Sequence, residues 1–533
     1  MSKVTASQSA AILAIAGLIG LAGCMVGPSY HPPKPIISAR FGESPFKAGK
    51  MPPGWVKAAP DMAQFPKGDW WTIFRDPQLN QLEGMVATSN QSLKEYEAQY
   101  RKAAAMIDSV AAQLYPTLNG KFSFGRTMHG TGSTNSATGG STGYYGAGGN
   151  HNPPPHNSWT TMPTASWTVD VWGTVRRQIQ EQIRSTQADA ALVANMKLSY
   201  ELQLAEDYFS MRYQDSLIDL YGRNVKLYAE NLHILENQMK AGVTDPASVL
   251  QAQYQYQSTQ ASYANAHVAR AQYEHAIAVL VGKPPAWLHL PHDPLPNTLP
   301  PPPVALPSTL LERRPDIAQA ERNMASMNAE IGYEIGAFYP QITLTANYGY
   351  AGNPLMSLFD IGMLTWSLGA GATETIFEGG SRAAAVRSAV ADYDDAVANY
   401  RQTVLSALQD TEDQLSNLRY LGEQKEKVND ALTTANQAVR VAMNEYMAGT
   451  QIYTTVISAQ QAALSYAQNA LGVQNQRYQA ELKLITDLGG GWSRKDLPST
   501  GALLPDNPLV PAPILPNTNG VLNPDGKPAH IEP

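Results

Sequence analysis

The stretch Leu114-Tyr115-Pro116-Thr117-Leu118 recurs as Phe338-Tyr339-Pro340-Gln341-Ile342. Each copy follows a helical pattern, and each precedes alternating, strand-like runs and then a very long helical pattern. The apolar residues before the two copies match at one constant offset: Leu93, Ile107 and Leu114 correspond to Ile317, Ile331 and Phe338. An internal duplication of helix, strand pair and helical hairpin is typical of a scaffold built from repeated units. We therefore expect a structural protein and not an enzyme.

The N-terminus predicts export and lipid attachment. Lys3 is followed by an apolar segment from Ala10 to Ala22, which is too short to cross a bilayer as a stable helix. It ends in Leu21-Ala22-Gly23-Cys24, which resembles a bacterial lipobox. The alternative for a lone cysteine is a buried apolar residue, but Cys24 is the only cysteine and directly follows the apolar segment. We predict a signal peptide over residues 1–23 and a lipidated, palmitate-bearing Cys24 as the first mature residue. Met25, where an aspartate would indicate inner-membrane retention, favours the outer membrane.

Composition excludes several classes of partner. The net charge is −7, only 16% of the residues are charged, and no concentrated Lys/Arg stripe is present, so we expect no nucleic-acid binding. A single cysteine allows no disulfide within the chain. After the signal segment no run approaches the ~20 apolar residues that a membrane helix needs, as an outer-membrane protein requires.

Proline placement predicts two exceptionally long helical hairpins. Prolines are absent between Pro163 and Pro246 and between Pro354 and Pro498, so long helices can run uninterrupted there. The first runs from about Thr174 to Lys240 and is on the order of 100 Å long at ~1.5 Å per residue. It is broken at Lys240-Ala241-Gly242, and its counterpart is broken at Met447-Ala448-Gly449. The predicted units are 24–116 (lipidated segment, equatorial region and first helices), 173–283 (first hairpin), 284–315 (Pro-rich linker), 316–340 (second-repeat helix), 378–492 (second hairpin) and 493–533 (Pro-rich tail).

The remaining segments, 117–172 and 341–377, alternate between apolar and polar residues. Odd positions are mostly apolar between Trp159 and Val171, whereas even positions are apolar between Ile342 and Tyr350 and between Leu364 and Ala372. Leu118, Phe122 and Phe124 give a weaker first strand. Such runs match transmembrane β-strands. A half-buried sheet of a soluble domain is the alternative, which the export signal disfavours. A Gly/Ser/Thr/Asn-rich insertion at 126–158 is predicted to be an extracellular loop. Four strands cannot close a barrel and open edges are forbidden in lipid, so several copies must share one barrel.

The chain resembles the outer-membrane efflux (TolC-like) family, specifically its lipoprotein branch. The resemblance covers about Cys24 to Trp492. It is carried by CMVGPSY at 24–30, WWTIF at 70–74, DPQL at 76–79 and LPSTLLERRPDI at 306–317. It implies a mainly α protein of the Gram-negative cell outer membrane, a homotrimer with a shared 12-stranded β-barrel and a periplasmic α-barrel. It also implies a passive efflux duct that carries exported small molecules, with a periplasmic adaptor and an inner-membrane RND-type transporter as partners.

The resemblance places a gate at the two hairpin breaks, Gly242 and Gly449. Relatives commonly carry acidic residues just after each break, but this sequence has no carboxylate between Gly449 and Gln460. Asp245 remains near the first turn, although an ordinary turn residue before Pro246 is an equal interpretation. Closure should therefore depend on neutral hydrogen bonds, with Tyr446 and Gln451 as lumen-side groups. The other candidate gate positions are neutral: Ser248, Thr455 and Ser458.

No nucleophile–base pair, phosphate loop or metal cluster is recognisable, so no catalytic residue, metal or cofactor other than the lipid is expected. We predict that His289 and His292 are solvated loop residues and that Arg314 forms local ion pairs. The alternative function is an adaptor or structural lipoprotein that bridges membranes through helical hairpins. An adaptor would have one hairpin, and the duplication argues against it. A wide duct takes its selectivity from the pump, so the residues predict no particular cargo.

Overall fold

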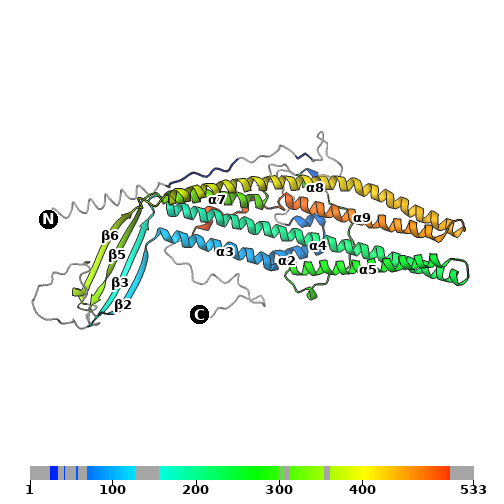
Figure 1. Cartoon of the computed structure of the whole chain (residues 1–533), viewed down its shortest axis with the longest axis horizontal. Coiled ribbons are helices and arrows are strands. Elements are labelled where there is room, and N and C mark those ends of the chain that lie inside the picture. The colour runs from blue at the N-terminus through cyan, green and yellow to red at the C-terminus, as the bar shows by residue number, and fades with distance from the viewer. Residues whose placement is uncertain are drawn as a thin grey trace, which may run out of the picture.

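The computed structural model describes residues 25–33, 41–42, 56–57, 69–127, 155–300, 303–304, 313–352 and 360–504. A four-stranded sheet lies at one end of an elongated molecule, and long helices extend from it to the opposite end (Figure 1). The predicted Cys24, the signal peptide, most of the 126–158 insertion and residues 505–533 lie outside the described part.

The two repeats have the same element order and nearly the same dimensions. The first contains α3 (Gln91–Ala111), β2 (Thr117–Thr127), β3 (His156–Val169), α4 (Thr174–Lys240) and α5 (Pro246–Leu280). The second contains α7 (Pro315–Gly336), β5 (Gln341–Gly352), β6 (Leu364–Thr373), α8 (Ser381–Met447) and α9 (Tyr453–Asp487). Helices α4 and α8 each have 67 residues, and α5 and α9 each have 35. The predicted duplication is confirmed.

The repeats differ mainly in one loop. Between the strand ends, 28 residues join β2 to β3 and 11 join β5 to β6, a difference of 17. The repeat offset accordingly changes from 224 residues for Leu93 and Ile317 to 207 residues for Gly242 and Gly449. The loop prediction for 126–158 needs a correction at its ends, because strand pairing continues out to Thr127 and His156.

Glycines set the boundaries of the long helices. Gly242 and Gly449 have φ of 73° and 72°, the left-handed conformation that ends a helix at little cost for glycine. After the first break, the Val243 N–H donates to the Gln238 carbonyl, which closes the last turn of α4. The long helix predicted from about Thr174 to Lys240 and both predicted breaks are confirmed.

The sheet has the antiparallel order β2-β3-β5-β6, so β2 and β6 are its two edges. Its register separates the two faces cleanly. One cross-strand row is apolar, Leu118, Ala165, Ala346 and Leu368, and the neighbouring row is polar, Asn119, Thr164, Asn347 and Ser367. The predicted alternation is thus confirmed in all four strands, and it gives one apolar and one polar face.

The largest apolar core lies midway along the helices. Here η2 (Trp70–Phe74) and α2 (Pro77–Ser89) pack against α4, α5 and α9, with Trp70 and Leu79 fully buried. The proline-rich segment after η4 (Pro285–Trp287) contributes Leu288, Leu290 and Leu295 to this core. Arg212 of α4 connects α2 to that segment through ion pairs with Asp76 and Asp293. We call this region the collar.

The first described residues, 25–33, form a strap along α4 and α7. Its contacts are long-range in sequence. The Val26 N–H donates to the Trp172 carbonyl (3.2 Å), Arg177 donates to the carbonyls of Val26 and Gly27 (2.7 and 3.0 Å), Asn328 donates to the Pro28 carbonyl (3.3 Å), and the Tyr30 hydroxyl donates to Glu321 Oε1 (2.7 Å). The strap therefore begins where β3 gives way to α4.

Short elements complete the described chain. β1 (Val56–Lys57) pairs in parallel with β4 (Pro303–Val304). After α9 come η7 (Arg494–Asp496) and the single turn α10 (Thr500–Leu503), and Leu503 packs beside α3 and α4. Among the helices described, none combines the length and the hydrophobicity needed to cross a bilayer.

Candidate functional site

The tips of the two helical hairpins lie together at the end of the molecule farthest from the sheet (Figure 1). Their apolar contacts come from all four long helices. This tip cluster consists of Leu235 of α4, Val249 and Ala252 of α5, Ala442 of α8, and Tyr453, Val456 and Ile457 of α9. The sequence periodicity thus buries one face of each hairpin against the other.

Polar contacts between the tips are neutral. The Tyr446 hydroxyl donates to Gln238 Oε1 at 2.6 Å, which joins α8 to α4, and its ring meets Tyr453 edge-on at 5.1 Å. Deeper along the seam, Gln461 Nε2 of α9 donates to Gln255 Oε1 of α5 at 2.5 Å. These hydrogen bonds carry no formal charge, so salt screens them little.

Asp245 is the N-cap of α5. Its carboxylate accepts hydrogen bonds from the Ser248 N–H (3.0 Å) and the Ser248 hydroxyl (2.7 Å), which lower the pKa of Asp245. Ser248 is buried by this arrangement, so it does not offer a hydroxyl to the surface. The residue serves local structure as an N-cap.

The candidates on α9 and in the turn before it are exposed. Gln451, Thr455 and Ser458 all face solvent; the Thr455 hydroxyl lies 3.4 Å from Gln451 Oε1, and the Ser458 hydroxyl donates to the Thr454 carbonyl. The gate prediction considered acidic residues only after each helix break, and it therefore missed Glu445. This exposed residue lies four positions before Gly449, in the last turns of α8.

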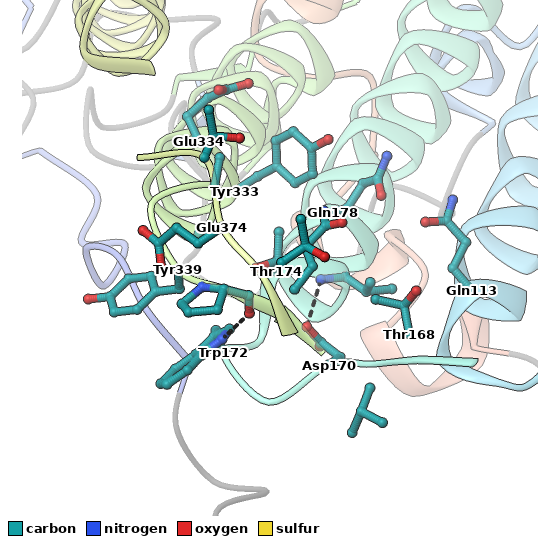
Figure 2. A pocket seen from close by; sticks show the side chains of 18 of the residues that line it. Gln113, Thr168, Asp170, Trp172, Thr174, Gln178, Tyr333, Glu334, Tyr339 and Glu374 are labelled. Atoms are coloured by element: carbon teal, nitrogen blue, oxygen red, sulfur yellow. Dashed lines mark hydrogen bonds between the residues drawn. The ribbon is translucent and has the colours of Figure 1, made fainter. Parts of the chain in front are cut away.

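A second feature is a cavity of about 720 Å³ where the sheet meets the helices (Figure 2). It opens on the polar face of the sheet, because Thr117, Ser166 and Thr373 line it. The helices line its other side through Gln178 of α4 and Glu334 of α7. The recurrent motif forms part of its wall: Trp172 stacks on Tyr339 at 4.9 Å and donates to the Pro340 carbonyl at 2.8 Å.

The cavity wall is acidic. Asp170 is neutralised by Arg176 and caps the start of α4, and Arg382 pairs with Glu378. Glu334 has no ion pair among the described residues. Glu181 lies on α4 one helical turn after Gln178. Its burial, together with the charges of Glu330 and Glu334, raises the pKa of Glu181 to about 7. The polar side of the sheet therefore continues into an electronegative helical wall.

The other residues singled out from the sequence have structural partners. Arg314 pairs with Asp316 and Asp487, as the prediction of local ion pairs required. His292 is an exposed loop residue, as predicted, and it also contacts Asp215 and Asp219. In the described part of the chain, no three His, Cys, Asp or Glu side chains converge as metal ligands would.

Comparison with known proteins agrees with this architecture. A family model described as outer membrane efflux protein matches residues 84–283 and 306–490, which together contain both repeats. The probable efflux pump outer membrane protein TtgC of Pseudomonas putida is 26% identical over 494 residues, covering 91% of this chain and 96% of the relative. The probable outer membrane lipoprotein SilC of Salmonella typhimurium is 25% identical, covering 90% and 98%.

Solved structures show the same fold. The outer-membrane channel OprN superposes with a TM-score of 0.76 at 25% identity, covering 88% of this chain and all of that one. The chain belongs to the outer membrane efflux protein family.

Proposed function

We propose that three copies of this protein form the passive outer-membrane duct of a tripartite efflux pump, docked through a periplasmic adaptor to an inner-membrane transporter. The observation that carries the proposal is the four-stranded sheet with one apolar face and two open edges. In hydrocarbon every backbone N–H and C=O group needs a partner, so β2 of one copy must meet β6 of another. Three copies supply twelve strands.

The two faces of the sheet then have separate roles. Leu118, Trp366 and Leu368 are largely exposed in the single chain and would contact lipid. The polar face of the sheet would line the lumen, together with the cavity where the sheet meets the helices. A wall of this kind suits transit of hydrated solutes, because polar side chains replace water at its surface.

The hairpin tips would close the periplasmic end. The neutral bonds from Tyr446 to Gln238 and from Gln461 to Gln255 hold the α8/α9 hairpin against the α4/α5 hairpin. An adaptor that separates the hairpins must break these bonds and expose part of the tip cluster. An adaptor role for this chain itself is disfavoured, since it has two hairpins and a sheet with a lipid-type face.

The assembly is tested by native mass spectrometry of the detergent-extracted protein, followed by conductance measurements in planar bilayers. We expect a mass of three subunits and large, stable channels. A folded monomer with a protected sheet, or a trimer without conductance, would contradict the proposal.

Lipid attachment is tested separately. We expect Cys24 to incorporate radioactive palmitate, and Cys24→Ser to lose the label while the trimer still forms from the contacts described above. Acyl chains contribute about 0.8 kcal/mol per buried CH₂, so they assist targeting while the barrel supplies insertion. Labelling that persists in the Cys24→Ser variant would refute the lipobox interpretation.

A further inference from the structure

The collar contains a group of buried oxygen atoms that have no donor. Glu83 of α2 is completely buried, and neither of its carboxylate oxygens has a hydrogen-bond partner in the described part of the chain. Glu201 of α4 is 3% exposed, and its Oε1 likewise has no hydrogen bond. Asn80 lies one helical turn before Glu83, and its side-chain oxygen is also buried and unpartnered.

The cations that could neutralise this group are few. Lys197 Nζ is 3.7 Å from Glu201 Oε1, and the Trp70 indole N–H donates to Glu201 Oε2 at 3.3 Å. Asp69 adds a further negative charge near Glu201. Among the described residues no cation is paired with Glu83, and the one charge that acts on its pKa is the like charge of Glu201. The nearby Arg212 is already paired with Asp76 and Asp293.

Two carboxylates cannot both be ionised at such a site. Burying an unpaired carboxylate costs far more than protonating it, and the like charge of a second carboxylate increases that cost. A proton would also supply what the group lacks, because a neutral carboxyl has an O–H that can donate to an orphaned oxygen. We propose that Glu83 and Glu201 hold one proton between them in the folded protein, and that this proton clamps α2 onto α4 in the collar.

The electrostatic environment agrees with this assignment. Burial, with a smaller contribution from Glu201, raises the pKa of Glu83 well above its usual value. Burial also raises the pKa of Glu201 to about 7, against the opposing effect of Lys197. The ordinary pKa of both groups, 4.5, applies once α2 has left α4.

The sign of the pH effect follows from linkage. Between pH 4.5 and the raised pKa, the clamped state binds a proton that the released state lacks. The clamp is therefore fully effective below the ordinary pKa and weakens as the pH rises, by about tenfold in the opening equilibrium per pH unit for one proton. The collar would be tighter in an acidified periplasm and looser in an alkaline one.

The test must report on α2 alone, because Glu481 of α9 is also fully buried, has no hydrogen-bond partner in the described part of the chain, and has a pKa that burial raises to about 9. Hydrogen–deuterium exchange of α2 is measured in the full-length trimer between pH 6 and 9 and corrected for the intrinsic exchange rate. We expect protection of α2 to fall up to tenfold per pH unit, while α3, which has no buried carboxylate, stays level.

Glu83→Gln is the informative variant, since its amide copies the shape and the donor of a protonated carboxyl. We expect α2 to keep its protection at pH 6 and to lose the pH dependence. The matched control, Glu95→Gln at an exposed site on α3, should behave like the unmodified protein. Infrared spectra supply a second readout: the unmodified protein at pH 7 should show the C=O stretch of protonated, buried carboxyls, and Glu83→Gln should weaken this band while the contribution of Glu481 remains.

Equal pH slopes in the Glu83→Gln variant and the unmodified protein would overturn the proposal, as would the absence of the protonated carboxyl band at pH 7. Protection that depends on added Na⁺ or Ca²⁺ and not on acid would also overturn it, and would assign the orphaned oxygens to a metal cation.

Discussion

The Tyr446 hydroxyl connects the two hairpin tips through its hydrogen bond to Gln238. The Tyr446 ring meets the buried Tyr453 ring edge-on, and the hydrogen bond is partly buried, so water competes less well for the hydroxyl. A neutral hydrogen bond of this kind contributes about 1 kcal/mol net, and three copies act in a trimer. The tips are consequently held by a modest free energy that an adaptor could supply by binding.

Tyr446→Phe removes the hydroxyl and keeps the ring. We expect the closed tip to lose roughly 1 kcal/mol per subunit, so that the open probability of the reconstituted channel rises at least several-fold. Tyr466→Phe on α9 deletes the same atom from an exposed ring and should leave the channel unchanged. Single-channel recording decides the matter: equal open probability for the Tyr446→Phe variant and the unmodified protein would show that this bond does not hold the gate.

At the scale of elements, the sequence was sufficient where one local feature determines the backbone. Gly242 and Gly449 sit at positive φ, and the long proline-free stretches carry helical spacing, so helix ends and breaks could be predicted closely. Strand alternation was equally reliable, because one face of the sheet is mostly apolar. The weakest strand pattern, β2, lies at an edge, where only one neighbour constrains it.

Long-range packing could not be predicted in the same way. The proline-rich segment near Leu290 looks like a linker in the sequence, yet it contributes to the collar core. The strap contacts partners roughly 150–300 positions away, and no local pattern encodes them. Glu83 falls on the apolar face of an ordinary amphipathic helix, and its isolation becomes visible only when Glu201 is brought beside it.

The strap supplies a prediction at this scale. Gly27 has φ of 97°, and a Cβ atom there would lie 2.4 Å from the Cα of Gly332. Gly27→Val should detach residues 25–33 from α4 and α7, because it introduces both a strained backbone and a clash with a helix backbone. Limited proteolysis or hydrogen exchange should report the release.

Gly84→Ala in α2 is the control, since its added Cβ meets nothing within 4 Å and its backbone is helical. The Gly84→Ala variant should resist proteolysis and hydrogen exchange as well as the unmodified protein does, or slightly better. A Gly27→Val protein whose strap stays protected would mean that the close approach to Gly332 is not maintained in solution.

On the scale of the whole molecule, the distribution of charge differs between the two ends of the proposed lumen. Near the sheet, Glu181, Glu330 and Glu334 form an electronegative wall, with no cation paired to them in the described part of the chain. At the tips, the carboxylates within four positions of either turn glycine are Asp245 and Glu445. Asp245 is engaged as a helix cap, which leaves Glu445 as the free acidic group.

The entrance should therefore bind multivalent cations weakly. Rings of like charges in a narrow, poorly solvated opening repel one another and attract counter-ions, and neutral Thr455 and Ser458 remove both effects. We expect trivalent cations added on the periplasmic side to inhibit conductance only slightly. Ser458→Asp should introduce strong inhibition that weakens as the pH falls toward the usual aspartate pKa of about 4, because protonation removes the new ring of charge.

Two variants show which carboxylate causes any remaining inhibition by trivalent cations. Asp245→Asn should change inhibition little, since the carboxylate already accepts two hydrogen bonds from Ser248 at the start of α5. Glu445→Gln should remove whatever slight inhibition the unmodified protein shows. If the unmodified channel is strongly blocked and Glu445→Gln abolishes the block, then an acidic ring does guard the entrance, placed before the turn on α8 instead of after it on α9, and the neutral gate proposed here is wrong.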